Sequence, residues 1–184
     1  MRFHPWVFSG AIAQIVGEPA EGDIVGVFSQ GGDFLAYGHY QIGSIAVRVL
    51  SFAGEDVLSP DFWKNMIARA LRVRVAVGLA CPVSSAAEPV SPVAEPVSPV
   101  AEPVEATGLV REPALTNCYR LIHGEGDGLP GLIIDYYDGV CVMQAHSVGM
   151  FRAKGAICEA LKSVYGPSLK AVYDKSSGTA PFKA

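Results

Sequence analysis

The sequence lacks the features that mark membrane, zinc-binding and nucleotide-hydrolysing proteins. None of its apolar runs reaches the ~18 residues that a membrane span needs. It has no CxxC or HExxH spacing, and no Gly-Lys-Ser/Thr follows its glycine-rich loop as in a Walker motif. Only 17% of the residues are charged and the net charge is −4, so any contact with nucleic acid has to rest on local patches.

Cysteine is scarce and scattered. The opening residues, MRFHPWVFSG, lack the apolar core and the cleavage site of a secretory signal. We therefore expect reduced thiols, a cytoplasmic location and no metal site. The cysteines, none of which lies in a recognisable catalytic motif, are Cys81, Cys118, Cys141 and Cys158.

A proline-rich repeat divides the chain. The segment Ala87–Val93 (AEPVSPV) recurs as Ala94–Val100, and Ala101–Val104 begins a third copy. Proline in every seven-residue unit excludes a coiled coil and favours an extended spacer. We predict a linker or insertion over residues 79–113, with one folded unit on each side.

The unit before the repeat has the pattern of short strands. Apolar, β-prone stretches cover Trp6–Ile15, Gly22–Ser29, Asp33–Tyr40 and Ser44–Ser51, and Gln30–Gly32 is a tight-turn signal. Several short strands separated by glycine turns are typical of a small barrel or sandwich. We therefore predict a small β-barrel for this unit.

The period then changes to that of a helix. Ser59 can cap a helix in which Pro60 takes the first position. Two i,i+4 rows make one broad apolar face, namely Phe62, Met66 and Ala70 beside Trp63, Ile67 and Leu71. The segment is also basic. Its cations either form a solvated helix face, which is the default interpretation, or contact phosphates: Lys64, Arg69, Arg72 and Arg74.

The stretch Tyr119–Ala145 carries the densest run of glycine and proline in the folded units. Glycine serves where the chain takes positive φ or approaches another backbone closely, and proline fixes its own φ. After this loop, Leu132–Tyr137 predicts a strand, Asp138–Gly139 a type I′ turn, and Val140–Ala145 the partner strand. The loop residues that we single out are Gly124, Glu125, Asp127, Gly128, Pro130 and Gly131.

Two interpretations of this acidic loop are open. In the first, Glu125 and Asp127 are acid/base groups or ligands of a hard cation, as in a small metal-dependent hydrolase. In the second, which we favour, the loop is a structural turn whose carboxylates cap backbone N–H groups. The regular oxygen ligands of an EF-hand loop are missing, and two carboxylates without further ligands give little support to a metal site.

The unit after the repeat, residues 114–184, mixes strand and helix. Ser147 can cap a helix that runs through Val164, and Gly166–Pro167 closes it. Leu169–Tyr173 is a further strand. The order strand, hairpin, helix, strand predicts a small α+β domain, so the whole chain belongs to the α+β class.

Three motifs together resemble one protein family. They are HPWVFSGAI at His4–Ile12, VRVLS at Val47–Ser51 and YRLIHGEGDGLPGLIIDYY at Tyr119–Tyr137. They resemble the large-subunit ribosomal RNA methyltransferase I family, whose members use S-adenosylmethionine (SAM) to methylate cytosine C5 in 23S rRNA. The resemblance implies a PUA-like RNA-binding domain over residues 1–78 and the family's central α+β domain over residues 114–184.

The resemblance also implies what this sequence leaves out. Members of the family continue past the position of Ala184 into a Rossmann-like methyltransferase domain. Their glycine-rich cofactor loop and catalytic cysteines have no counterpart here. We therefore expect a fragment without catalytic residues, which binds no SAM and is inactive alone. The alternative is a stand-alone, non-enzymatic RNA-binding protein of the PUA type.

The expected partner is RNA, with 23S rRNA implied by the resemblance, and a homodimer is left open. Trp6 either stacks on a base or, more commonly for an aromatic residue in an apolar strand, belongs to the core. Arg48 alternates with Val47 and Val49, so it should face away from the core and remain available. The candidate RNA contacts are Arg2, His4, Trp6, Arg48, Lys64, Arg69, Arg72 and Arg74.

Overall fold

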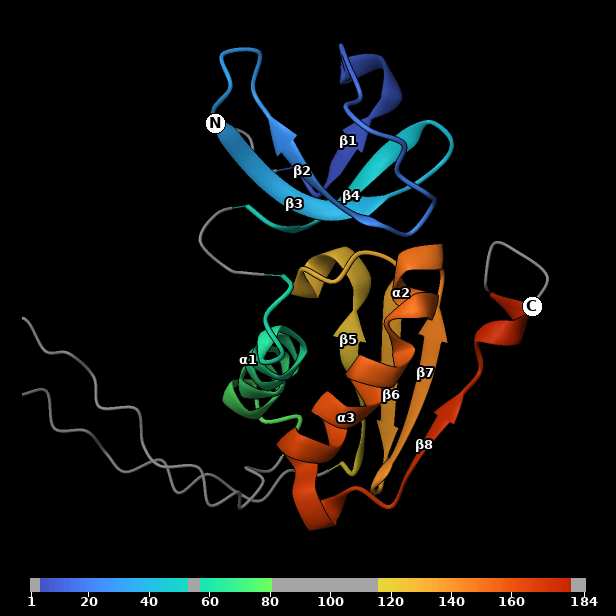
Figure 1. Ribbon diagram of the computed structural model, residues 1–184. Coiled ribbons are helices and arrows are strands. Elements are labelled where there is room, and N and C mark those ends of the chain that lie inside the picture. Colours follow the sequence, from blue (N-terminus) through green and yellow to red (C-terminus); the bar gives the residue numbers. More distant parts are fainter. Residues whose placement is uncertain (1–3, 53–56, 81–115, 180–184) are drawn as a thin grey trace, which may run out of the picture.

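The computed structural model of the chain describes residues 4–52, 57–80 and 116–179. It contains two four-stranded sheets, drawn one above the other in Figure 1, and the helices α1, α2 and α3 lie against one face of the lower sheet. The repeat tract, most of the predicted linker and Arg2 lie outside the described residues.

The first sheet contains the four strands predicted for the N-terminal unit. They are β1 (Trp6–Phe8), β2 (Ile24–Phe28), β3 (Phe34–Tyr40) and β4 (Ile45–Ser51), antiparallel in the order β1-β4-β3-β2. The first strand is shorter than predicted, because the chain turns at Ser9–Ala11 into a 3-10 helix, η1. Within residues 4–52 the edge strands β1 and β2 pair with β4 and β3 but not with each other, so the sheet is open where a barrel was predicted.

The second sheet confirms the predicted hairpin to the residue. Strands β6 (Leu132–Tyr137) and β7 (Val140–Ala145) are joined at Asp138–Gly139, whose φ angles of 45° and 91° are the left-handed pair that a type I′ turn requires. Strand β5 (Cys118–His123) pairs antiparallel with β6, and β8 (Ala171–Asp174) runs parallel to β7. The order is β5-β6-β7-β8.

Two helices connect β7 to β8. Ser147 caps α2 (Val148–Arg152) as predicted, and its hydroxyl accepts a hydrogen bond from the Met150 N–H at 3.3 Å. The prediction of one uninterrupted helix is wrong. Ala153 has a ψ of −5°, far from the about −42° of a regular helix, and α3 (Lys154–Tyr165) begins after it. The helical crossover allows β8 to lie parallel to β7.

The basic helix α1 (Phe62–Ala76) buries the six apolar residues of the two predicted rows. It begins two residues later than predicted, at Phe62 instead of Pro60. Asp61 is the cap residue, and Ser59 instead accepts a bond from the Asp61 N–H at 3.4 Å. The helix packs mainly against α3 and β5, although it precedes the repeat in the sequence. The domain limits 1–78, 79–113 and 114–184 therefore stay a prediction, with α1 packed on the second unit.

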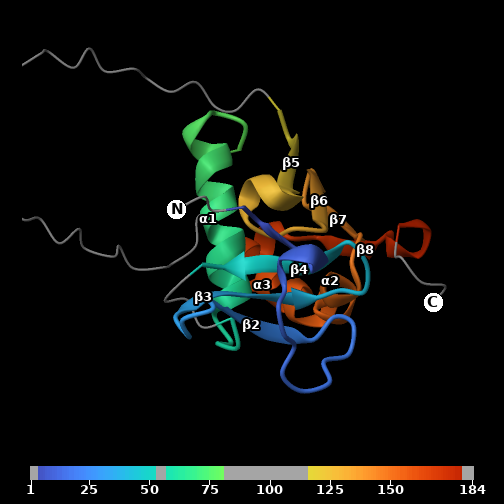
Figure 2. The same ribbon diagram turned by 90° about the horizontal axis from the view of Figure 1, so that it is seen from above.

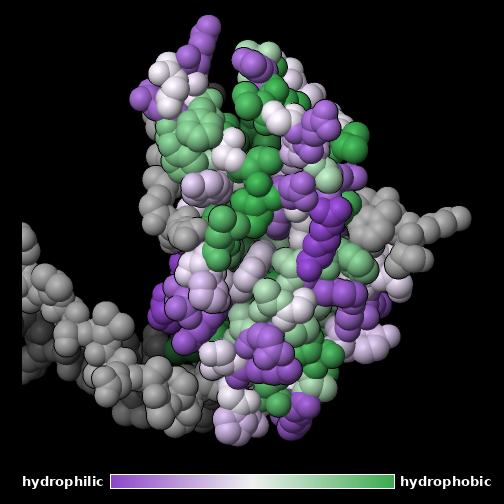
Figure 3. All heavy atoms as spheres, viewed as in Figure 1, coloured by the Kyte–Doolittle hydropathy of each residue, from purple (hydrophilic) through white to green (hydrophobic). Residues whose placement is uncertain are grey.

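One hydrophobic core joins these elements. Ile67 of α1, Leu121 of β5, Ile134 of β6 and Leu161 of α3 are fully enclosed in it, and Leu50 of β4 belongs to the same cluster. The first sheet therefore rests on the core of the second unit, and in Figure 2 its strands cross over the helices. Figure 3, which has the viewing direction of Figure 1, shows hydrophobic side chains that run from the first unit onto the second. No helix in the described parts of the chain is long and apolar enough to cross a membrane.

Candidate nucleic-acid interface

The first sheet presents a transverse row of side chains to the second unit. Trp6, Arg48, His39 and Ile24 lie directly opposite one another on β1, β4, β3 and β2. Directly opposed residues of antiparallel strands project from the same face of a sheet. This face is the one that meets the loop between β5 and β6, where the chain forms the 3-10 helix η2 (Gly124–Asp127).

Glu125 of η2 binds two members of this row. Its Oε1 accepts a hydrogen bond from the Trp6 indole N–H at 2.9 Å and one from Arg48 Nη1 at 3.2 Å. Gln41 holds the other side of the guanidinium, because its Oε1 accepts a bond from Arg48 Nε at 2.6 Å. The Arg48 guanidinium also lies over the Trp6 ring, 5.8 Å from its centroid. Glu125 therefore links the two units at a point where an indole and a guanidinium converge.

Asp127, the second acidic residue of the loop, has a structural role. Its carboxylate accepts a bond from the His123 N–H at 2.6 Å and a bidentate pair of bonds from Arg74. Arg69 Nη2 donates to the Asp127 carbonyl at 3.2 Å. The Asp127–Arg74 pair is almost enclosed, with 8% and 13% of the two side chains exposed. The favoured interpretation of a backbone-capping carboxylate thus describes Asp127, whereas Glu125 holds side chains of the other unit.

The backbone of the loop has the conformation that its glycines predict. Gly124, Gly128 and Gly131 have φ angles of 52°, 74° and 85°. Leu129 and Pro130 between them are fully buried. The loop is therefore a folded part of the core edge, and it holds Glu125 and Asp127 in fixed positions.

The predicted RNA contacts fall into three groups. Trp6, Arg48, Arg69 and Arg74 converge on η2. The structure differs from the expectation that Arg48 remains available, because only 16% of its side chain is exposed and the second unit covers it. His4 beside β1, and Lys64 and Arg72 on α1, are exposed. Arg2 lies outside the described residues.

An aromatic cluster borders the Arg48 site. The ring centroids of His4, Trp6 and Phe8 lie 5.6 to 6.3 Å from one another, and Phe8 is 47% exposed. Sequence reasoning missed Phe8, although alternate residues of a strand share a face, and the spacing His4, Trp6, Phe8 carries that signal. Exposed aromatic rings next to an arginine can stack on unpaired RNA bases.

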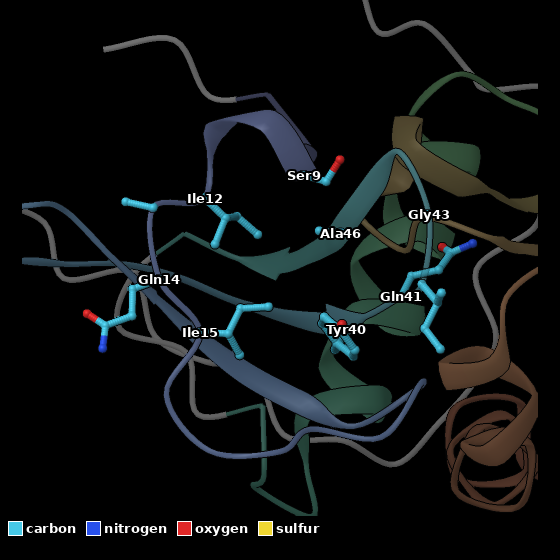
Figure 4. A pocket seen from close by; sticks show the side chains of 10 residues that line it. Ser9, Ile12, Gln14, Ile15, Tyr40, Gln41, Gly43 and Ala46 are labelled. Carbon is cyan, nitrogen blue, oxygen red and sulfur yellow. The ribbon is translucent and has the colours of Figure 1, made fainter.

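A hollow of about 410 Å³ is lined by residues from 9–15, which include η1, and by residues from 40–46 around the turn between β3 and β4. Figure 4 shows Ile12, Ile15 and Tyr40 pointing toward one another across it. Its lining residues are all uncharged, so an apolar or neutral group such as a base suits it better than a phosphate. No periodicity in the sequence indicated it, because its walls come from a loop and from a strand end that meet only in the folded chain.

The metal-site interpretation gains no geometric support. Within the described ranges, no three His, Cys, Asp or Glu side chains gather where they could hold a metal ion. Of the cysteines that the structure describes, Cys118 is exposed, Cys158 is half-buried and Cys141 is buried. Burial raises the pKa of the Cys141 thiol to about 12. That thiol is a protonated core group at neutral pH.

Comparison with known proteins places this geometry in a family context. A family model of the PUA-like domain matches residues 1–52, which contain the whole first sheet. Curated relatives from three bacteria carry the name ribosomal RNA large subunit methyltransferase I. The Pseudoalteromonas translucida protein is 34% identical over 176 residues, the Shewanella amazonensis protein 36% over 149, and an Escherichia coli protein 29% over 177. These matches cover 95%, 80% and 96% of this chain, but only 36%, 29% and 36% of the relatives.

Two solved structures share the fold at 14% sequence identity. One, from Streptococcus mutans, is provisionally assigned as a SAM-dependent methyltransferase; the match has a TM-score of 0.63 and covers 94% of this chain and 36% of that one. The other is a provisionally assigned methyltransferase in complex with SAH, with a TM-score of 0.64 and coverages of 95% and 37%. The resemblance predicted from the motifs is thus confirmed: the chain is homologous, over most of its length, to about a third of the ribosomal RNA large subunit methyltransferase I proteins.

Proposed function

We propose that this chain is the RNA-binding N-terminal portion of a SAM-dependent methyltransferase that acts on a cytosine C5 in 23S rRNA. The observation that carries the proposal is the homology over 95% of the chain to a protein named as an rRNA methyltransferase, together with the PUA-like match. Such an enzyme has to find one base in a large RNA, and an accessory domain supplies affinity and position for that search.

The proposed RNA-binding surface is the edge of the first sheet at β1. His4, Trp6 and Phe8 offer rings for stacking, and Arg48, which Glu125 covers, lies beside them. Lys64 and Arg72 on α1 are exposed cations that add sequence-independent attraction. Stacking and phosphate contacts position an RNA, and the choice of the modified base is left to the catalytic part of the relatives.

The described residues do not fit SAM, so we derive no chemical step from them. The larger hollow, of about 760 Å³, lies between α1 and β5 and contains two carboxylates. Arg74 Nη2 binds Asp127 at 2.7 Å and Arg120 Nε binds Asp135 at 2.8 Å, so a guanidinium group already engages each acid. We propose that the methyl donor and the catalytic residues belong to the two-thirds of the relatives that this chain does not match, and that this chain alone is inactive.

Fluorescence anisotropy with a labelled single-stranded fragment of 23S rRNA tests the proposal. We expect the full chain to bind it with an affinity that falls as salt rises. Phe8→Ala should weaken binding about tenfold, since a stacked base contributes about 1–3 kcal/mol. Phe28→Ala is the matched control, because Phe28 is also an exposed edge-strand phenylalanine, 60% exposed on β2. Absence of binding, or equal losses in the two variants, would refute the proposed surface.

A further inference from the structure

The carboxylate of Glu125 occupies a position that an RNA phosphate would fit. One of its oxygens, Oε1, accepts hydrogen bonds from the Trp6 indole and from the Arg48 guanidinium. We propose that Glu125 stands in for an RNA phosphate at this site, and that bound RNA displaces it and takes over both donors. The inference rests on the proposed RNA-binding function and assigns its central phosphate contact.

The Trp6 indole and the Arg48 guanidinium are already positioned to donate hydrogen bonds to an anionic oxygen. Trp6 and Arg48 are directly paired on β1 and β4, so their side chains project next to each other from one face of the sheet. Gln41 binds Arg48 Nε at 2.6 Å and thereby turns Nη1 toward Glu125. Carboxylate and phosphate oxygens accept the same charge-assisted bonds from a guanidinium, so one anion can replace the other without rearranging the donors.

The acid is the outer member of this group. Of its side chain 37% is exposed, compared with 16% for Arg48. Glu125 can therefore swing into solvent while Arg48 stays packed. The loop does not depend on it, because Asp127 holds η2 through Arg74 and the His123 N–H. Displacement of Glu125 would thus leave both units folded.

The surroundings complete a nucleotide-sized site. His4 and Phe8 lie within 6.3 Å of the Trp6 ring, so a base can stack next to the phosphate position. The site would recognise one phosphate and one adjacent unpaired base of single-stranded RNA. Because Glu125 joins the first sheet to the second unit, RNA binding here would also release one of the contacts that set their relative orientation.

The indole N–H resonances of the unaltered chain provide the first test. We expect the Trp6 indole signal to shift on titration with single-stranded RNA. The signal of Trp63, which is 9% exposed in the core, serves as the internal reference. RNA that binds without moving the Trp6 signal would overturn the inference and leave the proposed function standing. Failure of the chain to bind RNA at all would refute the proposed function itself.

The second test changes the charge of the acid. In Glu125→Gln the neutral amide competes less well than a carboxylate with a phosphate for Arg48, so we expect about fivefold tighter RNA binding. Glu159→Gln is the control for net charge, because Glu159 is a 72% exposed acid on α3. Equal affinity in both variants, or weaker binding by Glu125→Gln, would overturn the inference.

Discussion

Acidification should destabilise the fold through one buried histidine, His39. It lies on β3, is 3% exposed, and its Nδ1 is the buried side-chain atom without a hydrogen-bond partner in the described parts of the chain. Its ring contacts the backbone of Gly149 in α2 so closely that a Cβ there would lie 2.2 Å from it. Burial lowers the pKa of His39 from its usual 6.5 to about 4. Arg48, directly opposite on β4, carries the same sign as a protonated ring.

The sign and size of the effect follow from the two pKa values. The folded pKa of about 4 lies below the unfolded value of 6.5, so the unfolded chain binds more protons between these limits. The stability that the folded state gains from neutral His39 is fully present above pH 6.5. It decreases as the pH falls below this value and is lost as the pH falls through 4. In total it amounts to about 3 kcal/mol, of which about 2 kcal/mol is lost between pH 7 and pH 5.

Urea denaturation followed by tryptophan fluorescence at several pH values between 7 and 5 measures this loss. His39→Phe keeps a ring in the slot and removes the titrating group. Overpacking against Gly149 lowers its absolute stability. The diagnostic quantity is the pH dependence of the free energy of unfolding, which should be about 2 kcal/mol smaller in the variant over this range. His146→Gln removes an imidazole at an exposed position and serves as the control. Identical pH dependence in wild type and His39→Phe would refute the reasoning.

Two further substitutions test the packing that positions the interface. Gly149→Ala should lower the free energy of unfolding by about 2–3 kcal/mol, because the added Cβ would overlap the His39 ring. Gly155→Ala in α3 is the control, because a Cβ there meets open space. Equal unfolding midpoints for the two variants would contradict the close contact. Asp127→Asn should cost about 3 kcal/mol in urea denaturation, because it leaves the 13% exposed Arg74 guanidinium without its charged partner. A decrease in the free energy of unfolding of less than about 0.5 kcal/mol would show that the Asp127–Arg74 pair does not stabilise the fold.

The parts of the fold that the sequence predicted are those with local signals. The hairpin over 132–145 was located to the residue, because its turn chemistry and its flanking strands are adjacent in the chain. The buried face of α1 followed from helical periodicity alone. The Ser147 cap was likewise found from residues within one helical turn. In each case the residues that determine the structure lie close together in sequence.

The candidate site is formed by residues that are far apart in the sequence, so local sequence patterns could not predict it. Trp6 and Glu125 are 119 residues apart, and the repeat tract lies between them. Alternation along β4 correctly placed Arg48 on the face opposite Val47, but it does not state what covers that face. The partner of α1 was equally hidden, since an apolar helix face can pack on either sheet. Phe8 is the exception, because its i+2 spacing from Trp6 was a readable signal.

The contacts between the two units divide into those that hold them together and those that select their arrangement. Leu50 in the shared core and the His39 ring against Gly149 are buried, so their packing holds the two units together. The Arg152–Asp23 pair, with 52% and 45% of its side chains exposed, contributes little. Glu125 lies between these classes: it is half-exposed, and it binds two groups of the first sheet that RNA would also use. Its displacement would therefore loosen the orientation of the first sheet without detaching it, and would couple RNA contact at β1 to the arrangement of the units.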